Sequence, residues 1–242
     1  MKPFLLLSSR ANDAAADGER EAVCRLAGLS SRALVQLRLE RQPMPQLRLD
    51  DYSGVFLGGS DFCTSSPDKS ATQVRVESEL NSLLDRVVAA DFPFLGLCYG
   101  VGVLTNYLGG RVGHAHSEAV GAIEITLTEQ GRDDPLLAGV PDRFHAFVGH
   151  KEGADALPPG VTLLATGAVC PVQLFRLGRN VYAAQFHPEL DADGLIARMR
   201  VYESDGYFDP AEFDQIAAAA HASAVDGSQH LLLSNFVAIA GR

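Results

Sequence analysis

Apolar runs and amphipathic segments alternate along the first part of this chain. The runs FLLLS (4–8), VFLGG (55–59) and FPFLGLC (92–98) are continuous, which is typical of parallel strands that are buried on both faces. Between the second and third runs, residues 72–90 place apolar side chains on one helical stripe: Val74, Leu80, Leu83, Leu84, Val87 and Val88. A strand, a helix and another strand in this order predict a parallel sheet with right-handed crossover connections.

The second half of the chain has a different pattern. Short β-type segments separated by turn signals such as LPPG and LGRN extend from residue 119 to residue 184, and they predict mostly antiparallel strands. Residues 191–242 return to helical periodicity, and their aromatic side chains Tyr202, Tyr207 and Phe208 are expected to pack in the core. We expect a single domain over residues 1–242. The helical extension completes the core, packs over the site as a lid or forms a homodimer face.

Composition narrows the classes of function. The 242 residues carry a formal net charge of −10, and no cluster of Lys and Arg forms the basic patch that a nucleic-acid partner requires. No apolar stretch reaches the ~18 to 20 residues of a membrane span, and the N-terminal run is shorter than the core of a signal peptide. The four cysteines have no CxxC spacing, so neither a zinc site nor a disulfide framework is predicted. We therefore expect a cytoplasmic protein that binds neither nucleic acid nor a membrane and uses no metal or other cofactor.

The segment GLCYG, residues 96–100, places a cysteine between two glycines at a junction from strand to helix. This pattern is typical of a nucleophile elbow, a sharp turn that lifts a reactive side chain above the sheet and leaves no room for neighbouring Cβ atoms. The partial positive charge at the start of the following helix favours the thiolate form of Cys98. An ordinary buried cysteine flanked by packing glycines is the alternative.

A nucleophilic cysteine needs a base, and the base needs an orienting group. His187 ends an apolar segment in AAQFHPEL, and Glu189 follows two residues later on the same side of an extended chain. These residues predict a triad of Cys98, His187 and Glu189. A solvated histidine and glutamate at the end of a strand is the alternative for this motif.

An oxyanion hole requires backbone N–H groups that face the developing negative charge. Gly58 and Gly59 directly follow an apolar run, and Tyr99 follows the candidate nucleophile. We predict the N–H groups of Gly59 and Tyr99 as the donors, with Gly58 as a further candidate. A plain turn is the alternative for the two glycines.

Several segments together resemble the class I glutamine amidotransferases, and most closely the branch found in GMP synthetase. In chain order they are GGS, FLGLCYGVGVLTNYLGG, GHKEGADALPPGV, CPVQLFRLGRNVYAAQFHPE and LLSNF. The resemblance implies an α/β fold: an open, mainly parallel sheet of flavodoxin-like type with helices on both faces, plus a small antiparallel layer. It also implies that Cys98 attacks the side-chain amide of glutamine to give a γ-glutamyl thioester and ammonia, with His187 as base and Glu189 orienting it. His150, in GHKEG, lies where the family has a histidine motif near its partner-facing loop.

Two departures from the family pattern bear on substrate and partner. The family usually has a substrate-binding glutamine four residues after the nucleophile, whereas this chain has Gly102. The lost side chain is either replaced from elsewhere or leaves room for a γ-glutamyl compound larger than glutamine. The 242 residues also contain no segment that resembles the ATP-pyrophosphatase domain with which GMP synthetase uses ammonia, so we expect either a separate synthetase as partner or a different function.

Three functions therefore remain open. The first is a glutaminase that delivers ammonia to an acceptor held by a separate synthetase protein. The second is a freestanding γ-glutamyl hydrolase or peptidase that releases the same thioester to water. The third is a non-catalytic regulatory or binding module, which the presence of all three triad residues argues against.

Overall fold

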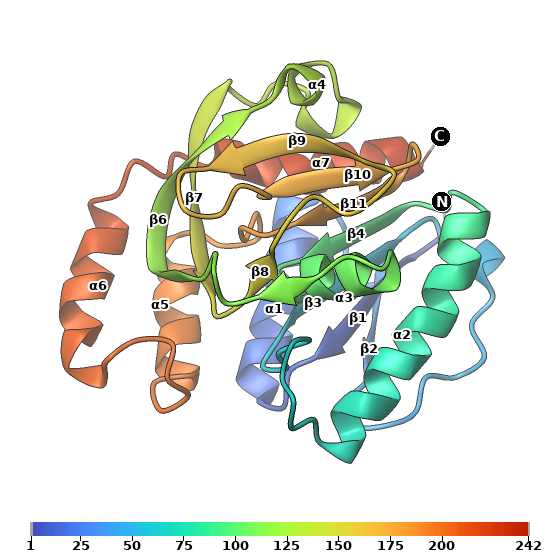
Figure 1. The fold of residues 1–242 in the computed structure, drawn as a ribbon, viewed down its shortest axis with the longest axis horizontal. Coiled ribbons are helices and arrows are strands. Elements are labelled where there is room, and N and C mark those ends of the chain that lie inside the picture. Colours follow the sequence, from blue (N-terminus) through green and yellow to red (C-terminus); the bar gives the residue numbers. More distant parts are fainter. Residues whose placement is uncertain (1, 242) are drawn as a thin grey trace.

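One twisted sheet runs through the molecule, and the computed structural model describes residues 2–241 (Figure 1). Nine strands lie in the order β2-β1-β3-β4-β11-β10-β9-β6-β7. These strands are β1 (Phe4–Ser9), β2 (Leu34–Arg38), β3 (Val55–Ser60), β4 (Phe94–Leu97), β6 (Glu118–Leu127), β7 (Arg143–His150), β9 (Val161–Gly167), β10 (Leu174–Leu177) and β11 (Val181–Ala184). A second, antiparallel sheet contains β5 (Val112–Gly113) and β8 (Gly153–Ala154).

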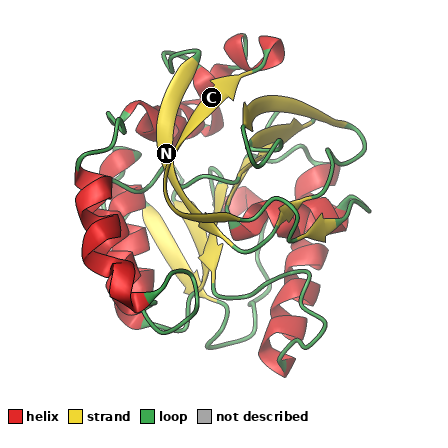
Figure 2. Cartoon of the chain, turned by 60° about the vertical axis from the view of Figure 1, so that its left-hand side comes forward, coloured by secondary structure: helices red, strands yellow, loops and turns green. Residues whose placement is uncertain are grey.

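Helices lie on both sides of the main sheet (Figure 2). The α-helices are α1 (Asp13–Leu26), α2 (Ala71–Ala89), α3 (Tyr99–Tyr107), α4 (Glu129–Arg132), α5 (Ala192–Val201), α6 (Phe213–His221) and α7 (Leu231–Ala240). Short 3-10 helices occupy Leu49–Asp51, Pro135–Leu137, Pro210–Glu212 and Ser228–His230.

Strand β1 shows why the apolar runs are continuous. Phe4 and Leu6 pack with side chains of α1 and α7, whereas Leu5 and Leu7 pack with side chains of α2 and α3. Adjacent residues of a strand point to opposite faces of the sheet, so a strand covered by helices on both faces has no polar side. All four side chains are at most 1% exposed.

The main sheet is parallel in one half and antiparallel in the other. Strands β2, β1, β3, β4 and β11 are parallel neighbours, and β10, β9, β6 and β7 continue the sheet in antiparallel pairs. The predicted α/β architecture with helices on both faces is confirmed. The antiparallel strands of the second half extend the main sheet itself, and the separate small layer consists of β5 and β8.

The stripe predicted along α2 is wrong at Val74. That side chain is 53% exposed, and Gln73 and Val76 are buried instead. Counting back from Leu80 by four residues and then by three gives positions 76 and 73, because residues at these spacings share a helix face. The apolar character of Val74 is therefore a surface feature rather than a core one.

The helical extension packs against the antiparallel half of the sheet. Helices α5 and α6 lie against each other, and α6 also lies against β6 (Figure 1). Phe147 of β7 shares a buried apolar cluster with Leu195 and Met199 of α5 and Ala220 of α6. Helix α7 returns to the face that α1 covers. We infer from this shared packing that the extension belongs to the same domain.

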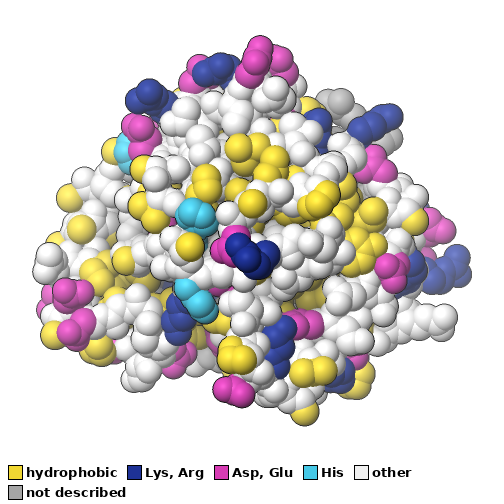
Figure 3. Space-filling model, in the orientation of Figure 1, with side chains coloured by type: hydrophobic (Ala, Val, Ile, Leu, Met, Phe, Trp, Pro, Cys, Tyr) yellow, Lys and Arg dark blue, Asp and Glu magenta, His cyan; other side chains and the backbone are white. Residues whose placement is uncertain are grey.

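The surface carries both signs of charge. Figure 3 shows basic and acidic side chains interspersed over one face of the molecule. Among residues 2–241, no helix combines the length and apolar character that crossing a membrane would require.

Candidate active site

Cys98 lies on the turn between β4 and α3. Its backbone has φ +50° and ψ −84°, a conformation that costs about 1 to 3 kcal/mol for a residue with a side chain. The Cys98 N–H donates to the carbonyl of Ala184 on the neighbouring strand β11 at 2.7 Å, which fixes the turn against the sheet. A Cβ atom added to Gly96 would lie 2.9 Å from Cα of Gly100. The close backbone approach at this turn therefore requires glycine at position 96.

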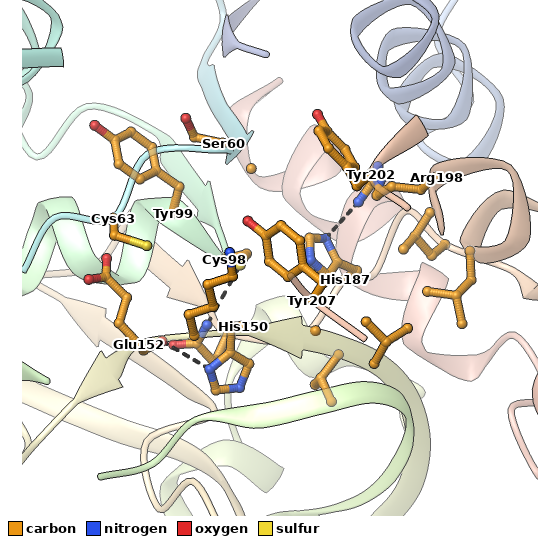
Figure 4. A pocket seen from close by; sticks show the side chains of 18 of the residues that line it. Ser60, Cys63, Cys98, Tyr99, His150, Glu152, His187, Arg198, Tyr202 and Tyr207 are labelled. Atoms are coloured by element: carbon orange, nitrogen blue, oxygen red, sulfur yellow. Dashed lines mark hydrogen bonds between the residues drawn. The ribbon is translucent and has the colours of Figure 1, made fainter. Parts of the chain in front are cut away.

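His187 lies shortly after the end of β11, next to the turn that carries Cys98. Strands β4 and β11 are parallel neighbours with Leu97 paired to Ala184, so the segments that follow them emerge at the same end of the sheet. The His187 N–H donates to the carbonyl of Phe147 on β7 at 2.9 Å. Cys98 and His187 line one pocket (Figure 4).

Glu189 and Arg198 hold the imidazole ring of His187. His187 Nδ1 lies 2.7 Å from Glu189 Oε1, and the Glu189 side chain is fully buried. Arg198 Nη1, on α5, donates to the same oxygen at 2.9 Å and lies 3.1 Å from His187 Nδ1. When Nδ1 donates its proton to Glu189 it has no free lone pair, so the contact with Arg198 is then not a hydrogen bond. Nε2 remains as the ring nitrogen available to a reacting group.

No sequence pattern identifies Arg198 as part of the site. The residue lies in DGLIARMRVYE, whose periodicity indicated only a packing helix. Its partner Glu189 precedes it by nine residues and is reached because the chain turns from the end of β11 into α5. A lone arginine on an amphipathic helix carries no local signal of such a contact.

The N–H group of Gly59 already has an acceptor. It donates to Glu19 Oε1 of α1 at 3.0 Å, and Arg10 Nε donates to the same oxygen at 2.9 Å. Arg10 and Glu19 are both buried. A Cβ atom on Gly58 would overlap the Glu19 carboxylate, and one on Gly59 would overlap Nη2 of Arg10. A buried carboxylate from another element therefore accepts from the N–H group that the sequence predicts as an oxyanion donor.

Tyr99 is the first residue of α3, so its N–H group has no acceptor within the helix. Its side chain is buried and packs edge-on against Phe62, with ring centroids 6.2 Å apart. The aromatic ring thereby anchors the start of the helix directly after the turn. Of the two donors predicted from sequence, Tyr99 is the one whose N–H the helix leaves open.

The segment that follows α5 supplies part of the pocket wall. Tyr202 and Tyr207 line the pocket beside Cys98 and His187 (Figure 4). Phe208 lines the same pocket, although the sequence pattern indicated only core packing for all three residues. Tyr202 Oη accepts a hydrogen bond from Arg10 Nη1 at 3.1 Å. A position over the site was one of the roles expected for the helical extension, but no local pattern assigns these three side chains to the pocket.

His150 also lines the pocket, and both of its ring nitrogens have partners. Nε2 lies 2.9 Å from Glu118 Oε2, and Nδ1 lies 2.9 Å from the carbonyl oxygen of Glu152. Glu118 Oε2 also accepts a hydrogen bond from Gln173 Nε2 at 2.7 Å. The Cys170 sulfur belongs to the same buried group, within 4.8 Å of the ligand-type atoms of Glu118 and His150. His150 therefore bridges strand β6 and the backbone at Glu152.

Residues 36–194 match the family model of glutamine amidotransferase class-I. The chain belongs to this family. A glutamine-hydrolysing GMP synthase from Thermomicrobium roseum is 36% identical over 137 residues, which are 57% of this chain and 23% of that protein. One subunit of a glutamine-hydrolysing GMP synthase from Methanoregula boonei is 31% identical over 154 residues, which are 63% of this chain and 73% of that subunit. The chain thus spans less than a quarter of the first relative and most of the second.

Solved structures share the fold of this class I amidotransferase. A glutamine amidotransferase from Thermotoga maritima has a TM-score of 0.80 at 20% identity, covering 100% of this chain and 99% of that one. A glutamine amidotransferase from Methylobacillus flagellatus has a TM-score of 0.76 at 18% identity, covering 98% and 95%. The likeness in fold therefore includes the helical extension, which lies mostly outside the residues matched by the family model.

In this amidotransferase, burial keeps the Cys98 thiol and the His187 imidazole uncharged near neutral pH. Burial raises the pKa of the Cys98 thiol to about 12, although the charge of Arg10 opposes the rise. Burial also lowers the pKa of His187 below its ordinary value, against the charge of Glu189. For Glu189, burial favours the protonated form, but His187 and Arg198 outweigh it and hold the pKa of that carboxyl well below its usual range. The effect of burial on the pKa of Cys98 thus outweighs the stabilisation of the thiolate that was expected from the helix N-terminus.

Proposed function

We propose that this chain hydrolyses the side-chain amide of glutamine through a γ-glutamyl thioester on Cys98. The observation that carries the proposal is the pocket shared by Cys98 and His187, in which buried Glu189 holds the imidazole ring. A thiol, a neutral imidazole and an orienting carboxylate are the groups that nucleophilic acyl transfer by cysteine requires. Membership of the class I amidotransferase family supports glutamine as the substrate.

The reaction has two halves. In the first, His187 Nε2 removes the thiol proton as the Cys98 sulfur attacks the γ-carbonyl carbon. The tetrahedral intermediate then collapses, the C–N bond breaks, and His187 returns the proton to the leaving nitrogen as ammonia. In the second half, His187 removes a proton from water as the water oxygen attacks the thioester carbon. The C–S bond then breaks, and His187 returns the proton to the Cys98 sulfur, which gives glutamate and the thiol. Glu189 stabilises the imidazolium that forms in each half.

The oxyanion of each tetrahedral intermediate needs hydrogen-bond donors or positive charge. In our proposal the Tyr99 N–H is the backbone donor, because it follows the nucleophile at the start of α3. Arg10 adds a buried positive charge, which lowers the pKa of Cys98 relative to burial alone. Gly59 contributes its N–H only when Glu19 Oε1 releases it.

We further infer that the ammonia passes to an acceptor held by a separate synthetase protein. The relative from Methanoregula boonei is named as one subunit of a GMP synthase, which supports a division of the reaction between two proteins. A γ-glutamyl hydrolase without a synthetase would use the same residues. Gly102 does not provide room for a larger substrate, because Thr64 and Glu152 fill the space that a side chain there would occupy.

The test is the mass of the intact protein after reaction with 6-diazo-5-oxo-L-norleucine, a diazo-ketone analogue of glutamine. We use a Cys63→Ser background, because Cys63 lines the same pocket. We expect one adduct on this protein and none when Cys98 is also changed to alanine.

Two results would contradict the proposal. An adduct that persists in the Cys98→Ala protein would overturn the choice of nucleophile. If no adduct forms while Cys98 still reacts with iodoacetamide, glutamine is not the substrate, and γ-glutamyl peptides become the next compounds to test.

A further inference from the structure

We propose that Gln185 is a further catalytic residue, whose side-chain amide donates a hydrogen bond to the Cys98 sulfur when that sulfur carries negative charge. The inference rests on the proposed function, because it concerns the charge on the sulfur during thioester chemistry. It adds a hydrogen-bond donor for the nucleophile to the base and the orienting carboxylate already described.

The side chain of Gln185 contacts the reacting atom. Its Nε2 donates to Cys98 Sγ at 3.7 Å, and within residues 2–241 this is the one hydrogen bond that the sulfur makes. Gln185 is 1% exposed and lines the same pocket as Cys98 and His187. The contact therefore lies inside the protein, where a hydrogen bond to a charged group is stronger than in water.

Two successive residues hold Cys98 at its backbone and at its sulfur. The carbonyl of Ala184 accepts from the Cys98 N–H at 2.7 Å, and the side chain of Gln185 reaches the sulfur. The Gln185 N–H donates in turn to the carbonyl of Gln173 at 2.8 Å, which fixes the backbone from which the amide extends. His187 follows two residues later, so one short segment supplies both the donor and the base.

The end of the amide that faces the sulfur decides its effect on ionisation. An N–H donor favours the thiolate, whereas a carbonyl oxygen would accept from the S–H group and favour the thiol. In Gln185 the Nε2 end contacts Cys98, and Oε1 is buried without a hydrogen-bond partner among the described residues. Buried carbonyl oxygens rarely lack a partner. The amide thus keeps an orientation that costs stability and favours the charged form of the sulfur.

Negative charge develops on the sulfur in both halves of the proposed reaction. It forms as His187 removes the thiol proton, and it forms again as the C–S bond of the thioester breaks. Between these steps the thioester sulfur is uncharged and is a poor acceptor. The Gln185 N–H therefore stabilises the charged stages more than the thioester, which lowers both barriers. Burial raises the pKa of the Cys98 thiol to about 12, and a donor at the sulfur offsets part of that effect.

The experiment replaces the amide and follows the reactivity of Cys98 in the Cys63→Ser background. Gln185→Met keeps a side chain of similar size without the donor, so alkylation of Cys98 by iodoacetamide should slow by about tenfold between about pH 6 and about pH 9. Gln185→Glu also adds a negative charge and should slow alkylation at least as much. Gln229→Met is the matched control: it changes another buried glutamine, whose amide donates to the carbonyl of Leu190, and should keep the wild-type rate.

Glutamine hydrolysis separates this role from a purely structural one. In Gln185→Met, kcat should fall by about tenfold while KM keeps its wild-type value, because the lost hydrogen bond goes to the sulfur and not to the substrate. A residue that only packs the core would lower the Tm of the variant without slowing the alkylation of the folded protein.

Two outcomes would overturn the inference. The first is an alkylation rate in folded Gln185→Met and Gln185→Glu that equals or exceeds the wild-type rate. The second is a side-chain amide signal of Gln185, in a proton–nitrogen NMR correlation spectrum, that does not move when Cys98 is changed to alanine. This second measurement keeps Gln185 itself, so it covers the case in which neither variant folds.

Failure of the proposed function gives a different result. In that case the wild-type chain forms no adduct with 6-diazo-5-oxo-L-norleucine, while alkylation of Cys98 by iodoacetamide still slows in the Gln185 variants. The two failures are thereby distinguished.

Discussion

His187 and Arg198 bind the same oxygen of Glu189. The distances from Oε1 are 2.7 Å to His187 Nδ1 and 2.9 Å to Arg198 Nη1. The other carboxylate oxygen, Oε2, is buried without a hydrogen-bond partner among the described residues. The orientation of the imidazole ring therefore depends on the position of helix α5, although α5 is far from the nucleophile in sequence.

Replacing Arg198 by methionine should lower kcat for glutamine hydrolysis by about tenfold or more, because Glu189 then loses the group that fixes it. The charge of Arg198 lowers the pKa of His187, so its removal should raise that pKa. The reaction needs neutral His187, and the acidic limb of the kcat/KM profile should therefore move to higher pH. Arg200→Met, on the exposed side of the same helix, is the control and should leave the limb in place. If the acidic limb of the kcat/KM profile stays at the wild-type pH in Arg198→Met, the charge of Arg198 does not control the pKa of His187.

Replacing Gly96 by alanine should destabilise the protein by about 1 to 3 kcal/mol or more, because the new Cβ would lie 2.9 Å from backbone Cα of Gly100. Gly18→Ala is the matched comparison. That position lies inside α1 with no heavy atom within 4 Å of an added Cβ, so alanine should stabilise by about 0.5 to 1 kcal/mol. Urea unfolding at constant m-value measures both changes. Equal effects at the two glycines would refute the steric explanation of the turn.

Cys98→Gly should be more stable than Cys98→Ala by about 1 kcal/mol. Glycine adopts φ +50° without the strain of about 1 to 3 kcal/mol that a side chain causes, and it loses about 0.4 to 1 kcal/mol through the greater freedom of the unfolded chain. Both variants lack the thiol, so they differ only in backbone energetics. Thermal unfolding of the two proteins checks the sign; a lower Tm for the glycine variant would show that the turn is not strained.

The alkylation of Cys98 by iodoacetamide in the ligand-free protein should accelerate about tenfold per pH unit between about pH 6 and about pH 9. Only the thiolate reacts, and burial raises the pKa of this thiol to about 12, so the thiolate fraction increases throughout the range. The Cys63→Ser background removes the second pocket thiol from the measurement. A rate that is already constant at low pH would instead indicate a thiolate–imidazolium pair.

The parts of the site that the sequence predicts are those with a local physical cause. Gly96 and Gly100 flank Cys98 because the turn brings their backbones together, and this requirement is visible within five residues of sequence. His187 and Glu189 are similarly close along the chain. The alternation of buried faces along β1 likewise appears as a continuous apolar run.

The parts that the sequence does not predict depend on contacts between distant elements. Glu19 occupies the Gly59 N–H from a helix 40 residues earlier, and Glu152 fills the space beside Gly102 from the other half of the sheet. Neither carboxylate lies in a pattern that indicates its partner. A charged residue on a helix or a loop is compatible with a solvated surface until the fold brings it to its contact.

The location of the reacting groups in the sheet has a consequence for the response of the protein to heat. Cys98 follows the central strand β4, and His187 follows its neighbour β11. A hydrogen bond from the Cys98 N–H to the carbonyl of Ala184 joins the ends of these two strands. Central strands open only in global unfolding, whereas peripheral segments with fewer buried contacts open at lower free energy. On gradual warming, the segment around Tyr207 would therefore loosen first and weaken substrate affinity, while the thiol and imidazole would remain together until the cooperative melting of the whole sheet.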